Sequence, residues 1–338
     1  MVTIKDVAKY AGVSISTVSR TLSGCVPVEE ETREAVMKAV KELEYKPNAI
    51  ARGLKKGRSK TLALILPSIM NPFYPKVFNY VDKFASEKGY ITLLLISNGD
   101  PQRERQHFEL AKSRYVDGVI LISSTDNTEH LESLKNEGLP LVLVNRMFDI
   151  DISSITNDNR KGAYDTVSYL IAQGHRKICC MGRDLSMQHY RQRYEGCIDA
   201  FRDHHIDGYE RFMAENVKTA EIAFRITREL LDGPDAPTAF FVFSDIIAEG
   251  VYSGVSYSGK HIPEDISVAG FDNINNSQYM IPPLTTYDHP IERIAERTVD
   301  ILIKHIAAVH GYCEAFDPIH EIVEGSLVIR SSVGKVKQ

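Results

Sequence analysis

The chain has 338 residues, of which 43% are hydrophobic and 25% charged, as is typical of a folded protein with a sizeable core. This length predicts two or three domains, and no run approaches the roughly 18 apolar residues of a membrane-spanning helix. The first ten residues include Lys5, Asp6 and Lys9 and no apolar segment, which argues against a secretory signal. Five cysteines without CxxC spacing favour reduced thiols and a cytoplasmic protein.

Charge is unevenly distributed along the chain, whose formal net charge is −5. Residues 1–60 contain 12 Lys and Arg against 7 Asp and Glu, whereas the remainder contains 28 against 38. A basic head on an acidic body predicts a polyanionic partner for the head alone.

Three short helices are predicted in the head. Thr3 can cap the first, with Asp6 as its reciprocal partner, and the apolar spacing of Ile4, Val7, Ala8 and Ala11 continues to Gly12. The third begins near residues 29–31, where three glutamates suit the positive end of a helix dipole, and continues to about residue 45. Its inward residues are Val36, Val40 and Leu43.

The second helix runs from Ser14 to Gly24 and has two unlike sides. Its packing side carries the apolar residues Ile15, Val18 and Leu22. Its opposite side carries the polar residues Ser16, Thr17 and Arg20. A solvated polar face is the plain interpretation of the second set, but a tight glycine turn and a basic head favour a helix-turn-helix domain. In that motif the second helix enters the major groove, where Arg can bind guanine and Ser or Thr a base edge or phosphate.

Residues 47–57, PNAIARGLKKG, combine linker composition with helical signals. Asn48 can cap a helix, and Ile50 and Leu54 are one turn apart. Two turns are marginal in water, and Gly53 weakens them further. We therefore expect a segment that is unfolded in the free protein and becomes helical on DNA.

The body alternates apolar runs with helical patterns from residue 60 onward. The apolar runs are residues 61–67, 91–97, 117–123, 140–145, 177–182, 239–244, 266–272 and 326–330. Strands that alternate with helices predict doubly wound parallel sheets, and this many predict two Rossmann-like lobes. The absence of a GxGxxG or P-loop motif argues against a nucleotide cofactor, and no cofactor or metal is expected.

Polar and aromatic residues follow several of the predicted strands, where open parallel sheets bind ligands. They are Asn71, Phe73, Tyr74, Asn145, Arg146, Ser244, Asp245, Asp272 and Asn273. Aromatic faces with Asn, Arg and Asp suit a small polyhydroxylated molecule. Structural roles stay open: the aromatic residues could belong to the core, Asp245 could cap the following helix, and Arg146 could pair with Asp149 or Asp151.

The head sequences TIKDVAKYAGVSISTVSRTLSG and ELEYKPNAIARGL closely resemble the lactose-repressor/galactose-repressor (LacI/GalR) family of bacterial transcription regulators. The resemblance covers essentially the whole chain and implies three parts. They are a helix-turn-helix domain at 1–46, a hinge helix at 47–58, and a periplasmic-binding-protein-like effector and dimerisation core at 59–338. Its N-lobe would comprise about 60–158 plus 290–318, and its C-lobe about 159–287 plus 321–332. The hinge would insert Leu54, beside Lys55, into the minor groove of DNA.

The resemblance also implies the residues that line an effector cleft. These are Phe73, Tyr74, Asn145, Arg146, Arg193, Ser244, Asp272 and His289. Sugar binders of the family often have Asn where Ser244 stands and Gln where His289 stands, so the identity of the ligand is open. The Asn145–Arg146 pair favours a sugar-like ligand over a purine.

The resemblance implies a regulator, most often a repressor, that binds a palindromic operator as a homodimer. The last residues, RSSVGKVKQ, lack the leucine heptads of the family's tetramers. An alternative is control mainly by a partner phosphoprotein. An enzyme acting on a small sugar is disfavoured because no GxSxG, HExxH or spaced carboxylate–histidine set appears. A transport-type binding protein does not explain the basic head, and a purely structural module does not explain the cleft residues.

Overall fold

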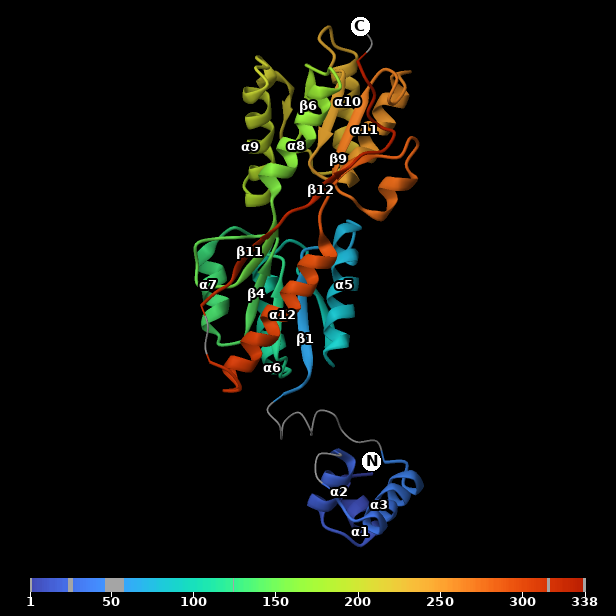
Figure 1. Cartoon of the computed structure of the whole chain (residues 1–338), viewed down its shortest axis with the longest axis vertical. Helices are drawn as coiled ribbons and strands as arrows, with labels where there is room; N and C mark the ends of the chain where they lie inside the picture. Colours follow the sequence, from blue (N-terminus) through green and yellow to red (C-terminus); the bar gives the residue numbers. More distant parts are fainter. Residues whose placement is uncertain (1, 24–26, 46–57, 124, 315–316, 337–338) are drawn as a thin grey trace. The chain divides into compact units, whose positions relative to one another are not determined.

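The structure, a computed structural model, describes residues 2–23, 27–45, 58–123, 125–314 and 317–336 (Figure 1). The chain divides into two compact units, residues 1–59 and 60–338. Most of the expected hinge, residues 47–57, lies outside the described residues.

The first unit contains α1 (Ile4–Ala11), α2 (Ile15–Ser23) and α3 (Glu30–Glu42). Its small core consists of the buried residues Val7, Ala8, Val18, Val36 and Ala39. The N–H of Thr3 donates to the Asp6 carboxylate at 2.8 Å, which is the predicted reciprocal interaction of a capping box. The Thr3 hydroxyl also donates to this carboxylate, at 2.7 Å.

The prediction for the packing side of α2 is wrong for one residue, Ile15. Ile15 is 45% exposed, whereas Val18 is buried and Leu22 packs against the core. Ile15 is the first residue of the helix, and Val13, in the preceding turn, packs against the core instead.

The first lobe of the second unit contains a six-stranded sheet in which every pairing is parallel. Its order is β11-β5-β4-β3-β1-β2. The strands are β1 (Thr61–Leu66), β2 (Ile91–Ile96), β3 (Gly118–Leu121), β4 (Leu141–Val144), β5 (Ser154–Asn157) and β11 (His320–Val323). Helices α5 (Phe73–Glu87) and α12 (Ile291–Val309) cover one face, and α6 (Pro101–Ser113) and α7 (Thr128–Asn136) cover the other.

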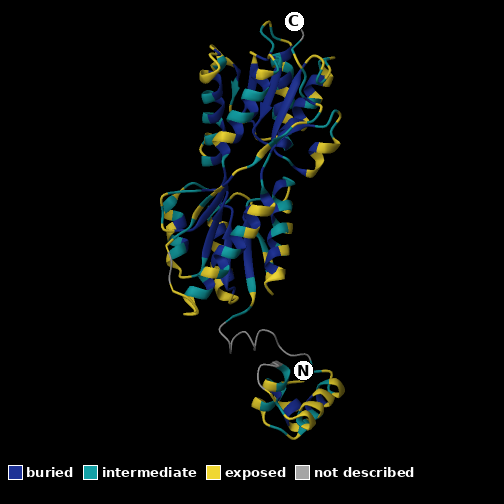
Figure 2. Cartoon of the chain, viewed as in Figure 1, coloured by how far each residue is buried: buried dark blue, intermediate teal, exposed yellow. Residues whose placement is uncertain are grey.

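Successive side chains of β1 point to opposite faces of the sheet, and both faces are covered by helices. Leu62 and Leu64 pack among α5 and α12, whereas Ala63 and Ile65 pack among α6 and α7. Figure 2 shows the resulting buried layer along the strands.

The second lobe contains a sheet of order β12-β10-β9-β8-β6-β7. Its strands are β6 (Ile178–Met181), β7 (Met213–Ala214), β8 (Ala239–Val242), β9 (Ser267–Asp272), β10 (Thr285–Asp288) and β12 (Ser326–Val328). Helices α8 (Asn159–Ala172) and α9 (Gln188–Asp203) cover one face, and α10 (Ala220–Leu231) and α11 (Asp245–Tyr257) cover the other. Short 3₁₀ turns lie at η1 (Tyr209–Phe212) and η2 (Asn275–Tyr279). The sheet is not purely parallel as expected, because β12 runs antiparallel to β10.

The chain passes between the lobes after β5, after β10 and after β11 (Figure 1). The third passage comes later than expected. The resemblance implies that the returning C-lobe segment begins at about residue 321, but residues 320–323 form β11, which pairs with β5 in the first sheet. The return to the second sheet therefore occurs between Val323 and Ser326.

Within the described ranges, no helix combines the length and the apolar character that crossing a membrane requires. Cys179, Cys180 and Cys197 are buried free thiols of the second lobe, and Cys313 is exposed. Burial raises the pKa of Cys179 and Cys180, which keeps both thiols protonated and unreactive.

Candidate functional site

The eight residues expected to line the effector cleft come from both lobes. Five lie at or just after the carboxyl end of a strand, whereas Phe73 and Tyr74 begin α5 and Arg193 lies within α9. Seven of them are buried, with at most 5% of their surface exposed, and Tyr74 is partly buried. A set this rich in polar groups is costly to bury unless its members are paired or bind a ligand. Their partners therefore indicate what each residue can do.

Arg193, in α9, forms the centre of the second-lobe part of the site. Its Nη1 is 3.4 Å from Asp272 Oδ1, and its Nε donates to Asn159 Oδ1 at 2.9 Å. The Ser244 hydroxyl donates to the other oxygen of Asp272 at 2.6 Å. The guanidinium carbon of Arg193 lies 3.6 Å from the centre of the Phe271 ring. Burial raises the pKa of Asp272, and Arg193 and Ser244 partly offset this effect, so the pair depends on both partners.

One alternative interpretation, in which Asp245 caps α11, is wrong. Asp245 is the first residue of the helix, fully buried, and its carboxylate accepts from Ser277 Oγ at 2.5 Å, Thr286 Oγ1 at 2.6 Å and Ile274 N at 3.1 Å. Burial and the neighbouring Asp272 raise its pKa to about 7. Asp245, at the beginning of α11, therefore holds the segment that follows β9 in place. Strand β9 itself ends in Asp272.

Aromatic rings form the first-lobe part of the site. The ring centre of Phe73 lies 5.3 Å from that of Tyr74 in an edge-on arrangement and 4.8 Å from that of His289. Burial raises the pKa of Tyr74 and lowers that of His289, so both side chains are neutral. Neutral rings with a hydroxyl and a ring nitrogen suit the stacking and hydrogen bonding that a sugar-like molecule requires.

Arg146 does not pair with Asp149 or Asp151. Its Nε donates to Asp126 Oδ1 at 3.0 Å, and its Nη1 is 2.7 Å from Nδ1 of His189 in the other lobe. Burial lowers the pKa of His189, so its ring is neutral and can accept this hydrogen bond. The protein itself thus engages the guanidinium that the resemblance assigned to the ligand.

Asp126 and Arg146 belong to a set of contacts that joins the lobes. Asp126 Oδ2 accepts from the backbone N of Gln188 at 2.5 Å, at the beginning of α9, where the N-cap residue Met187 makes no side-chain cap. The Gln188 amide accepts from Met147 N at 2.9 Å and donates to Met147 O. We call Asp126, Arg146, Met147, Gln188 and His189 the interlobe latch.

Four buried polar atoms near the site have no hydrogen-bond partner among the described residues. They are Oδ1 of Asn145, both Nδ2 and Oδ1 of Asn157, and Nδ1 of His289. These residues lie at or just after the carboxyl ends of β4, β5 and β10. Buried groups of this kind cost about 1–3 kcal/mol each unless something binds them. Asn157 was missed because β5 is short and has no continuous apolar run.

The polar face of α2 is the candidate DNA-binding surface. Ser16 and Arg20 are exposed, and Thr17 is partly exposed. Ser14 Oγ accepts from Thr17 N at 3.1 Å and lies within 2.8 Å of the hydroxyls of both Ser16 and Thr17. Leu54 and Lys55 lie outside the described residues.

Two family profiles match the chain. One describes bacterial regulatory proteins of the lacI family and matches residues 3–48. The other describes periplasmic binding proteins and the sugar-binding domain of the LacI family and matches residues 59–318. The chain belongs to the LacI family.

Individual relatives agree with this assignment along the whole chain. The HTH-type transcriptional repressor PurR of Mannheimia succiniciproducens is 32% identical, over 99% of this chain and 100% of the relative. The PurR repressor of Vibrio atlanticus is 33% identical, over 97% and 99%. A structure of the lac repressor dimer bound to operator and the anti-inducer ONPF has a TM-score of 0.88 at 26% identity, over 98% and 99%. A complex of the regulator CelR with cellobiose has a TM-score of 0.73 at 28% identity, over 98% and 100%.

Membership of the LacI family establishes the class of activity of this chain. This LacI-family chain is a DNA-binding transcriptional regulator with a helix-turn-helix head and a two-lobed binding core, and it is not an enzyme. The buried polar cluster between its lobes is accordingly a candidate for ligand binding.

Proposed function

We propose that the protein is a cytoplasmic repressor that binds a palindromic operator as a homodimer and responds to a sugar-like effector between its lobes. The unsatisfied atoms of Asn145, Asn157 and His289, set among the rings of Phe73 and Tyr74, carry the proposal. Hydroxyl groups can donate to and accept from these atoms, while the aromatic faces cover an apolar face of the ligand.

Related structures contain effectors and operator DNA. The lac repressor dimer was solved with operator and an anti-inducer, and CelR with cellobiose. The effector site of this chain is proposed to comprise Phe73, Tyr74, Asn145, Arg193, Ser244, Asp272 and His289. Arg146 is proposed to act on the effector indirectly, through the interlobe latch.

The proposal is tested by operator selection followed by a response assay. A pool of random duplexes selected on the full chain should yield a palindrome, and fluorescence anisotropy should then follow its affinity while a panel of sugars and sugar derivatives is added. A compound of this panel should change operator affinity by about 5- to 150-fold, as expected for allosteric coupling. Enrichment of no sequence would contradict the proposal, as would an operator affinity that no compound of the panel alters.

Base reading is proposed to depend on Ser16, Thr17 and Arg20, with Leu54 and Lys55 entering the minor groove as the family resemblance implies. Arg20→Ala should lose roughly 1–3 kcal/mol of discrimination at one base pair of each half-site, since Arg binds guanine through two hydrogen bonds. Binding to every single-base variant of the selected operator measures this. Lys38→Ala, on the exposed side of α3, is the control, and any change in affinity that it causes should be equal for all sequences. A base profile that Arg20→Ala leaves unchanged would rule out this role.

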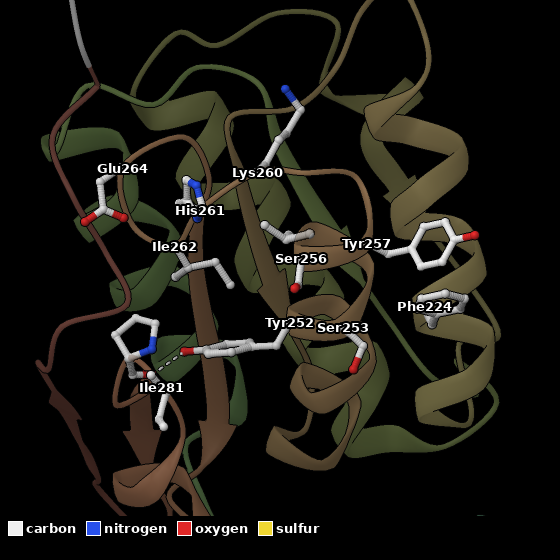
Figure 3. Close-up of a pocket in the computed structure, with 12 residues that line it drawn as sticks. Phe224, Tyr252, Ser253, Ser256, Tyr257, Lys260, His261, Ile262, Glu264 and Ile281 are labelled. Carbon is white, nitrogen blue, oxygen red and sulfur yellow. Dashed lines mark hydrogen bonds between the residues drawn. The ribbon is translucent and has the colours of Figure 1, made fainter.

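A surface of the second lobe is proposed to form the dimer interface. A cavity of about 950 Å³ lies there between the end of α11 and the segment at 281–282 (Figure 3). Exposed apolar side chains surround it: Tyr257 is 67% exposed and Ile281 92% exposed. Phe224 stands edge-on to Tyr257, with ring centres 5.7 Å apart, and the Tyr252 hydroxyl donates to Pro282 O at 2.9 Å. Exposed apolar side chains around a cavity are expected to be buried against another protein surface, here a second copy of this chain.

Ile281→Arg should convert the dimer to a monomer, because it places a charge among the exposed apolar groups of the proposed interface. Sedimentation velocity over a range of protein concentrations measures the change, and operator affinity should fall with it. Val309→Arg is the matched control: Val309 is 65% exposed and lies in the last turn of α12. If Ile281→Arg sediments like the unchanged protein, this surface is not the interface.

A further inference from the structure

Around the effector site, arginines outnumber the carboxylates that pair with them. Arg146 pairs with Asp126 at 3.0 Å, and Arg193 pairs with Asp272 at 3.4 Å. Asp126 also lies 3.6 Å from the guanidinium of Arg191. Asp126 and Asp272 are therefore already paired with arginines of the protein, and the third buried carboxyl group, Asp245, accepts its hydrogen bonds from residues after β9 and in β10.

Arg183 is a further cation on the second-lobe side of this site. It follows β6 by two residues, at the carboxyl end of the strand, where open sheets bind ligands. Its carbonyl oxygen accepts from Asn216 N at 3.1 Å, which anchors the backbone. No described carboxylate lies within 4.0 Å of its guanidinium, and the adjacent Asp184 pairs instead with Lys218 at 3.3 Å.

The Tyr190 ring places Arg183 beside the site. The guanidinium carbons of Arg183 and Arg193 are each 5.6 Å from the centre of this ring. The ring centre of His189 lies 3.8 Å from the same ring. Arg183, which is only partly exposed, thus shares an aromatic neighbour with the arginine that holds Asp272.

The charge of Arg183 acts on residues of both lobes. Burial raises the pKa of Tyr74 and of Asp272, and Arg183 is among the cations that partly offset it in each case. Burial lowers the pKa of His189, and Arg183 lowers it further. The charge of Arg183 is therefore close enough to act on both lobes, in agreement with its place beside the Tyr190 ring.

We infer that the effector is an anionic sugar derivative, whose carboxylate or phosphate binds Arg183 while its hydroxyls bind Asp272, Asn145 and His289. The inference rests on the proposed function and specifies the ligand class of the same site. A guanidinium binds carboxylate and phosphate through parallel hydrogen bonds. An anion bound there would also neutralise the charge of Arg183, which a neutral sugar cannot do.

Matched sugars test the inference on the full chain by titration calorimetry. Each set contains a neutral sugar, its acid and its phosphate: glucose, glucuronate and glucose 6-phosphate, and galactose, galacturonate and galactose 1-phosphate. An anionic member should bind about 10- to 100-fold more tightly than its neutral counterpart, as expected for hydrogen bonds to a charged group. The acid and phosphate arms distinguish the two anions.

Arg183→Gln should lower the affinity of that anionic sugar to near the affinity of its neutral counterpart, and Arg183→Lys should restore part of the loss. Arg202→Gln, which removes an exposed arginine from the far end of α9, is the control. Neutral sugars that bind as tightly as their anions would overturn the inference, as would a panel in which no anion binds or an Arg183→Gln variant that keeps the preference. If a neutral compound then alters operator affinity, the proposed function stands and only the inference fails.

Discussion

Arg193→Met is expected to destabilise the second lobe by about 3–5 kcal/mol, which is the usual cost of removing one partner of a buried ion pair. Arg193 is 2% exposed and Asp272 is 5% exposed. The substitution leaves the Asp272 carboxylate with the Ser244 hydroxyl but without its cation. It also removes the donor to Asn159 and to the carbonyl of Phe243.

The loss of stability that Arg193→Met causes should depend on pH. Burial already raises the pKa of Asp272, and Arg193 counteracts this effect, so the variant should raise it further. A carboxyl group whose pKa is higher in the folded than in the unfolded state is most favourable when protonated. Its contribution to stability is then lost as pH rises through the folded-state pKa. The deficit of Arg193→Met should therefore be smaller at mildly acidic pH than at pH 8.

Chemical denaturation followed by circular dichroism measures both effects. The double variant Arg193→Met, Asp272→Asn should regain part of the stability, with a coupling of about 0.5–3 kcal/mol, because it removes the unpaired charge. Arg202→Met, at an exposed position of the same helix, should change stability by less than about 0.5 kcal/mol. The response to effector should be lost in Arg193→Met, while operator affinity without effector remains near normal. Equal stability of Arg193→Met and the unchanged protein would contradict the assigned pairing.

Much of the architecture could be predicted because it follows from local patterns. The continuous apolar runs of strands such as β1, β3 and β4 reflect sheets that are covered on both faces, and the apolar spacing of α1 reflects one packed side. Strands β5, β10 and β11 were not predicted, since they are four residues long and mix polar with apolar side chains. Strands β5 and β10 lie between two other strands, and β11 pairs with β5, so pairing with neighbours distant in the sequence defines them rather than a local apolar pattern.

The locations of the cleft residues also followed from pattern and resemblance, but their partners did not. Arg146 pairs with Asp126, which is 20 positions earlier in the chain, and with His189, which is 43 positions later. The contact with His189 depends on how the two lobes meet, and the contact with Asp126 depends on how the segments that follow β3 and β4 lie side by side. No local spacing encodes this relation, so the nearby Asp149 and Asp151 were reasonable but wrong candidates.

Gln188→Ala is expected to reduce the ratio of closed to open lobes by about tenfold. The substitution removes the two hydrogen bonds between the Gln188 side chain and the Met147 backbone, each worth roughly 0.5–1.5 kcal/mol. Asp126→Asn should act in the same direction, because it weakens both the ion pair with Arg146 and the only side-chain acceptor at the start of α9 among the described residues. The two substitutions should not be additive, since Gln188 takes part in both sets of contacts.

Energy transfer between labels on the two lobes measures this ratio. Exposed positions are available on α6 and α10, as Glu109→Cys and Arg225→Cys in a Cys25→Ser, Cys313→Ser background. The population with a longer distance between labels should grow in Gln188→Ala, and not in the control Gln102→Ala, an exposed glutamine of α6. A ligand held by residues of both lobes binds only the closed form, so its apparent affinity falls in proportion to the closed fraction. Unchanged distances in both latch variants would mean that the lobes are held together by their three chain connections and the contact from Lys76 Nζ to Asn273 O, rather than by the latch.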